Sequence, residues 1–173
     1  FKEKALEMAT MNEEVSQSCF YVLERKNADG TKKRIEGPGV RLAEIIGAAY
    51  SNMRYGARMI GDDGKYVIAQ GAAFDMENNV AMTIEVRRRI TNKYGQRYSD
   101  DMVAVTANAA CSIALRNAIF RVIPKALVEP IYQAAKKAAI GDVKTLSSRR
   151  EKALEHFAKM GVAKDRIFSS LEV

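Results

Sequence analysis

Cationic side chains dominate the segment RRRITNKYGQR at residues 87–97, which holds five of them and no acidic side chain. A surface that binds nucleic-acid phosphates needs many fixed cations and few anions, so this segment indicates a nucleic-acid interface. Arginine suits the task because its planar guanidinium can bind two phosphate oxygens at once. The alternative is a solvated hairpin whose charges only keep the protein soluble.

Two tyrosines lie among or beside these cations, and aromatic rings can stack on the bases of a single strand. The same rings are equally suited to ordinary packing across strands. Alternation along the preceding strand puts Arg87 and Arg89 on its polar face, whereas Arg88 shares a face with apolar residues and is structural as readily as functional. The candidate DNA-binding residues of this region are Arg87, Arg88, Arg89, Lys93, Arg97, Tyr94 and Tyr98.

The whole chain is moderately basic, with 28 Lys and Arg against 21 Asp and Glu in 173 residues, which favours a nucleic-acid partner. A hydrophobic fraction of 47% excludes a disordered chain. We see no apolar run long enough to cross a bilayer and no secretory signal, so we expect a cytoplasmic protein with no membrane partner. Because the first residue is Phe1 and not Met, we expect the natural N-terminus to lie upstream.

The residues that bind metals and cofactors are sparse. His156 is the only histidine, and Cys19 and Cys111 are far apart in apolar surroundings, so we expect two buried free thiols and no zinc site. The Gly-containing stretches GPGVRL and GDDGK lack the spacing of a phosphate-binding loop. The sequence therefore predicts no metal, no cofactor and no use of ATP.

A metal-dependent nuclease is the enzymatic alternative. Asp75, Glu77 and the Glu85–Arg87 segment resemble two carboxylates and a cation around a metal ion. However, Asp75 and Glu77 border the turn DMENN, where acidic residues are favoured for turn formation alone. A third alternative is a non-enzymatic structural or interaction protein that oligomerises without DNA.

Changes in hydrophobic periodicity predict an α+β fold, in which an antiparallel β-hairpin and a three-stranded meander pack against helices. The turn signal NADG joins two strands within residues 18–37. We expect a core domain at 1–141 and a small helical tail at 142–173. The remaining expected elements are a leading helix at 1–17, a helix at 40–53, strands at 54–60, 65–76 and 80–90, a long helix from 100 to 123, a helix at 125–141 and tail helices at 145–162 and 163–173.

Residues 18–124 resemble the phage single-strand annealing proteins of the Red-beta, RecT and Erf type. The resemblance rests on GPGVRLAEIIGAAYSNM as a first helix, on YVIAQGAAFD paired with AMTIEVRRRIT, and on the small-residue-rich helix TANAACSIALRNAIFRVIP. It implies ATP-independent annealing of complementary DNA strands in recombination, without catalysis. It also implies ring or filament homo-oligomers, and a single-stranded-DNA-binding protein or an exonuclease is a possible partner of the tail.

The resemblance further implies a basic groove for single-stranded DNA between a hairpin and the long helix. Arg116 falls where the family has a cation on the groove side of that helix. Asn117 departs from the family, which often has a second cation there, and Arg121 one turn later is a possible replacement. From the sequence itself, Asn108, Ser112 and Arg116 follow at steps of four and form one polar stripe, whereas the alternative role of Arg116 is an ion pair with Glu85.

Overall fold

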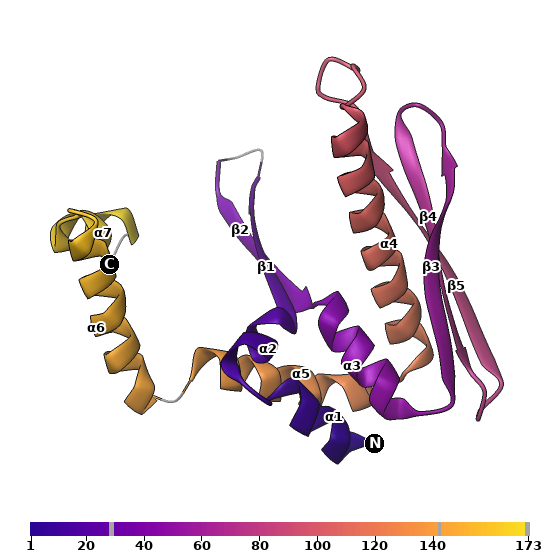
Figure 1. Cartoon of the computed structure of the whole chain (residues 1–173), viewed down its shortest axis with the longest axis horizontal. Coiled ribbons are helices and arrows are strands. Elements are labelled where there is room, and N and C mark those ends of the chain that lie inside the picture. The colour runs from indigo at the N-terminus through magenta and orange to yellow at the C-terminus, as the bar shows by residue number, and fades with distance from the viewer. Residues whose placement is uncertain (28–29, 142, 172–173) are drawn as a thin grey trace.

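The computed structural model describes residues 1–27, 30–141 and 143–171, and it has the expected α+β architecture (Figure 1). A two-stranded antiparallel hairpin, β1–β2, and a three-stranded antiparallel meander, β3–β4–β5, form separate sheets. In chain order the elements are α1 (Lys2–Ala9), α2 (Glu13–Ser18), β1 (Phe20–Lys26), β2 (Lys32–Pro38), α3 (Val40–Tyr50), β3 (Met53–Asp62), β4 (Tyr66–Asp75), β5 (Val80–Arg89), α4 (Asp100–Val122), α5 (Lys125–Ile140), α6 (Val143–Lys159) and α7 (Lys164–Leu171).

The long helix α4 covers one face of the meander (Figure 1). Alternate residues of the central strand β4, from Val67 to Asp75, are buried beneath it. Small side chains allow a close approach: Ala110, Ala114 and Ala118 are fully buried, and a Cβ at Gly71 would lie 2.3 Å from the backbone of Ala114. The opposite face of the sheet has no helix packed on it within the described residues.

A second group of helices forms the main core and supports the hairpin. Leu42 and Ile46 of α3, Ile119 of α4 and Ile131 of α5 are fully buried together. Helices α1 and α2 pack against α3 and α5, respectively, so the hairpin rises from the base that these helices make (Figure 1). An ion pair between Lys136 of α5 and Glu36 of β2 ties the base of the hairpin to α5.

Several boundaries differ from the sequence expectation. The leading helix is two helices, because Asn12 caps α2 by accepting a hydrogen bond from the amide of Val15 at 2.9 Å. The basic run spans two elements: its first three arginines end β5, and the rest lies in a connection to α4 that is closed by a bridge between Thr91 and Arg97.

The two cysteines are free, as expected, but only one is fully buried. Burial raises the pKa of the Cys19 thiol to about 11, whereas Cys111 is half-buried. In the tail, α6 packs on α7, and Figure 1 shows this pair apart from the rest of the fold. Part of the expected NADG turn, residues 28–29, lies outside the described residues.

The expectation that no segment is long and apolar enough to cross a membrane was wrong for α4. Within the described residues, this 23-residue helix alone meets that criterion by length and composition. A soluble protein's core helix can meet the same criterion, because an interior-facing helix is also rich in apolar residues. Here α4 lies along the sheet, but only 22% of its most apolar window is buried, so most of that window is exposed.

Candidate nucleic-acid interface

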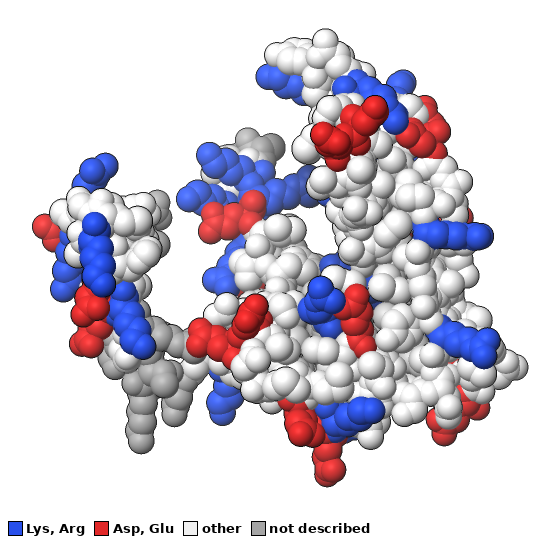
Figure 2. All heavy atoms as spheres, viewed as in Figure 1, with Lys and Arg blue, Asp and Glu red and all other residues white. Residues whose placement is uncertain are grey.

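A groove of about 450 Å³ lies between the β1–β2 hairpin and α4, and we call it the hairpin–helix groove. Figure 2 shows this face of the molecule hollowed between the two elements, with Lys and Arg side chains gathered on the hairpin. Among the residues that the structure describes, the only charged side chains that line it are Arg88 from β5 and Arg116 from α4. Its other lining residues are Ser18, Phe20, Tyr21, Leu23, Gly39, Val40, Ser112 and Ile113.

Arg116 is held in this groove by neutral partners. Its Nε and Nη2 atoms donate to Oδ1 of Asn117 at 3.2 and 3.0 Å, and its guanidinium lies 5.2 Å from the ring centroid of Tyr21. No carboxylate within the described chain forms an ion pair with it, so the expected alternative of a pair with Glu85 is absent there. The half-buried guanidinium is therefore oriented without being neutralised, which suits it to bind an external anion.

The three consecutive arginines of β5 are divided between the two faces of the sheet. The register places Arg88 opposite Val67 on the face that α4 covers, and Arg88 reaches the groove beside α4. Arg87 lies on the other face, where it forms a 2.9 Å ion pair with Asp63. Arg89 shares that face and donates to the Thr91 hydroxyl and the Asn92 carbonyl. The structure thus brings Arg88, not its neighbours, together with Arg116.

The hairpin adds cationic side chains on the same side as the groove. Strand alternation puts Arg25 on the same face as Tyr21 and Leu23, and the register places Lys33 directly opposite Arg25. Among the paired strand residues that the structure describes, this face has no acidic residue, whereas Glu24 and Glu36 lie on the other face. Sequence reasoning missed Tyr21 and Arg25, although their alternation with Leu23 was the available signal.

The connection before α4 separates the remaining candidates of the basic run. Arg97 forms a two-bonded ion pair with Asp62, at 3.0 and 2.7 Å, and this hydrogen bonding lowers the pKa of Asp62 to about 2. Lys93 lies over the ring of Tyr94, which is 75% exposed at the loop tip. Tyr98 packs against buried apolar residues between α4 and the sheet, among them Val67 and Ile90. Ordinary packing therefore fits Tyr98 better than stacking on bases.

Arg121 does not line the groove. It is exposed near the C-terminal end of α4, beyond the turn that carries Arg116 and Asn117. Asn117, at the position where the resemblance implies a second cation, fixes the Arg116 guanidinium through its amide oxygen.

The carboxylates of the nuclease alternative do not meet. Asp75 is buried on the α4 side of β4. The Asn78 side-chain amide donates to its carboxylate at 2.8 Å, the backbone N–H groups of Asn78 and Glu77 donate as well, and these hydrogen bonds lower the pKa of Asp75. Glu85 lies opposite Gln70, on the other face of the sheet. No group of three or more metal-binding side chains occurs within the residues that the structure describes.

Comparison with known proteins adds no assignment: no family model, no curated protein and no solved structure matches this chain.

Proposed function

We propose that this protein binds single-stranded DNA in the hairpin–helix groove and promotes ATP-independent annealing of complementary strands. The observation that carries the proposal is the meeting of Arg88 and Arg116, 28 positions apart in the chain, in one groove whose described lining residues include no acid. Guanidinium groups in a groove without described acidic lining bind the sugar–phosphate backbone, and contacts to the backbone alone do not read the sequence.

The apolar and aromatic lining of the groove supports a single strand as the ligand. Tyr21, Leu23 and Ile113 supply apolar and aromatic surface next to the cations, which is what unpaired bases need for stacking. Annealing requires that a strand be gripped by its backbone while base edges stay free to pair. The proposed protein therefore acts by holding a strand extended and by neutralising its charge, and no covalent step is involved.

The biological setting that we propose follows the family resemblance: recombination of phage type, carried out by a homo-oligomer. The nuclease alternative has no specific observation in its favour, since its carboxylates lie on different faces of the sheet. The main alternative to the proposed function is a structural protein that oligomerises without DNA. Binding to single-stranded DNA distinguishes the proposed function from this alternative.

The test is an annealing assay with two labelled complementary oligonucleotides, run with and without magnesium and ATP, with strand length checked on a denaturing gel. We expect faster annealing that needs neither addition and leaves both strands intact. Shortened strands in magnesium would support the nuclease. Absence of any salt-sensitive binding to single-stranded DNA would refute the proposed function.

A further inference from the structure

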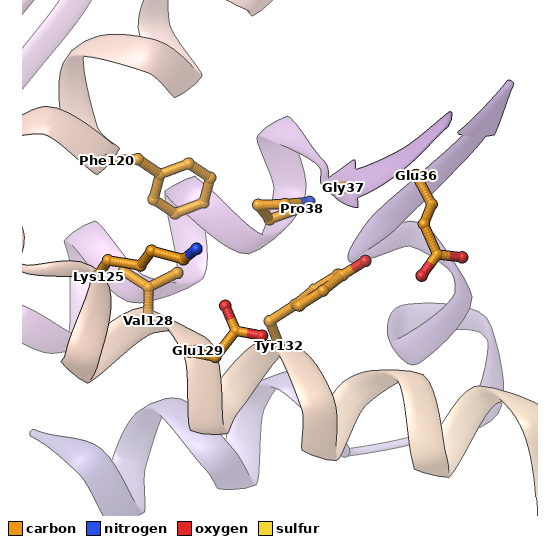
Figure 3. Close-up of a pocket in the computed structure, with 8 residues that line it drawn as sticks. All are labelled: Glu36, Gly37, Pro38, Phe120, Lys125, Val128, Glu129 and Tyr132. Atoms are coloured by element: carbon orange, nitrogen blue, oxygen red, sulfur yellow. The ribbon is translucent and has the colours of Figure 1, made fainter. Parts of the chain in front are cut away.

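A second cavity, of about 390 Å³, lies at the foot of the hairpin, between the end of β2, the last turns of α4 and the start of α5 (Figure 3). We call it the hairpin-base pocket. Figure 3 shows side chains from α4 and α5 converging on it from one side, while Gly37 and Pro38 close the other. Its lining residues are Glu36, Gly37, Pro38, Phe120, Lys125, Val128, Glu129 and Tyr132.

The pocket adjoins the hairpin–helix groove. Phe120 is four residues after Arg116, so both side chains lie on the same face of α4, one turn apart. Tyr21 lines the groove while its ring lies against Gly37 of the pocket, where a Cβ would come within 2.9 Å of the tyrosine hydroxyl. A strand bound at Arg116 therefore passes the mouth of the pocket.

The lining of the pocket is suited to a flat heterocycle with polar edges. The Phe120 ring and Pro38 supply apolar faces, whereas Tyr132 is only 7% exposed and has the Lys136 ammonium 5.6 Å from its ring centroid. At one end the Lys125 ammonium can donate and the Glu129 carboxylate can accept; Lys125 has no ion-pair partner within the described residues, and Glu129 is bound only by the Gln133 amide, at 2.8 Å. The volume is at the lower end of the range of about 300–1,000 Å³ that is usual for small-ligand sites.

We propose that the hairpin-base pocket binds one unstacked base of the single strand that lies in the groove, and that it favours bases with an exocyclic amino group. The amino group donates a hydrogen bond to Glu129 and a ring acceptor accepts a hydrogen bond from the Lys125 ammonium, as carboxylates and lysines do with base edges elsewhere. Thymine offers a carbonyl where cytosine has its amino group, so it leaves Glu129 desolvated and unpaired. This inference rests on the proposed function, because the base belongs to the strand that the groove binds.

Binding of fluorescent oligo(dC) and oligo(dT) of equal length, measured at pH 8 and low salt, tests the inference. Wild-type protein should bind oligo(dC) about tenfold more tightly, the effect of one hydrogen bond to a charged group. Glu129→Ala should remove this preference, whereas Glu85→Ala, which removes an exposed carboxylate on the far face of the sheet, should keep it. Phe120→Leu, which preserves apolar bulk without a ring, should weaken both oligonucleotides alike by about tenfold.

The outcomes separate the two proposals. If wild-type protein binds neither oligonucleotide, the proposed function fails and the pocket with it. If it binds both equally, and neither Glu129→Ala nor Phe120→Leu changes binding, the groove stands and the base-pocket inference is overturned. A change in the oligomeric mass of these variants without DNA, with DNA binding unaltered, would also overturn the inference. The pocket would then serve contacts between copies of the protein.

Discussion

At the scale of single residues, the orientation of Arg116 is set by its neighbours. Asn117 binds the Nε–Nη2 edge of the guanidinium, and Tyr21 lies across from it on the hairpin. An arginine that is fixed by neutral partners loses less conformational entropy on binding phosphate than one that swings freely, and it has no resident anion to displace. The neighbouring residue thus prepares Arg116 for an external anion.

Arg116→Ala should leave the melting temperature near that of the wild type, because no ion pair within the described residues is broken. Affinity for single-stranded DNA should fall, and the slope of log K against log salt should drop by about 0.7, the value for one phosphate contact on a single strand. Titrations at four salt concentrations measure both. A large loss of stability with a proportionate loss of binding would show instead that Arg116 holds the fold.

Arg97 is predicted to serve structure, through Asp62. Its hydrogen bonds lower the folded-state pKa of Asp62 to about 2 from an ordinary 3.8, so the pair stabilises the fold above pH 4, and this contribution is lost as the pH falls from about 4 to 2. In Arg97→Ala, NMR titration of the Asp62 carboxyl carbon should show a higher pKa. The value should stay below 3.8, because the Gly64 amide still donates to Asp62 at 2.8 Å. An unchanged pKa in the variant would contradict this role.

At the scale of elements, the fit of α4 on the meander depends on small residues. The helix approaches β4 so closely that any side chain at Gly71 would overlap the backbone of Ala114. This contact sets the position of α4, and therefore the distance between Arg116 and the hairpin.

Gly71→Ala should destabilise the protein by about 1–3 kcal/mol, the usual cost of overpacking, because neither backbone can move without repacking the sheet. Gly56→Ala is the matched control, since Gly56 lies on the uncovered face of the adjacent strand with nothing within 4 Å of its Cβ position. Urea unfolding of both variants makes the comparison. Equal stabilities would show that α4 does not approach the sheet as described.

The sequence predicted the elements well because their periodicities are local. Strand alternation and turn residues located the hairpin and the meander within a few residues of their observed bounds. The sequence also predicted, correctly, that Arg88 faces away from Arg87 and Arg89. It did not predict which face borders the groove, because that depends on how the hairpin packs beside α4. The sequence also could not predict the ion pairs of Arg87 and Arg97, since their partners, Asp63 and Asp62, are more than twenty positions away in the chain.

At the scale of the whole molecule, the meander leaves two strand edges open. Strands β3 and β5 each pair only with β4 within the described residues, and unpaired edges can join neighbouring copies. A contact from the β3 edge of one copy to the β5 edge of the next would be head-to-tail, and such contacts generate rings or filaments. The grooves of successive copies would then follow one another along a bound strand.

We accordingly expect self-association, which analytical ultracentrifugation or mass photometry would detect as species larger than the 19.2 kDa chain. Addition of single-stranded DNA should increase the size further, since a strand long enough for several grooves links copies together. Finding only monomer, with and without DNA, would count against annealing by an oligomer.

The central claim is that single-stranded DNA binds on the groove side of the sheet, and two adjacent arginines test it. Arg88 and Arg87 belong to one strand, are both exposed and carry the same charge, but only Arg88 lines the groove. The measurement is the affinity of Arg88→Ala and Arg87→Ala for one fluorescent oligonucleotide across a salt series. Our account predicts weaker binding and a slope shallower by about 0.7 for Arg88→Ala, with Arg87→Ala close to wild type. A larger loss of affinity in Arg87→Ala than in Arg88→Ala, or equal losses in the two variants, would place the DNA on another surface and contradict the account.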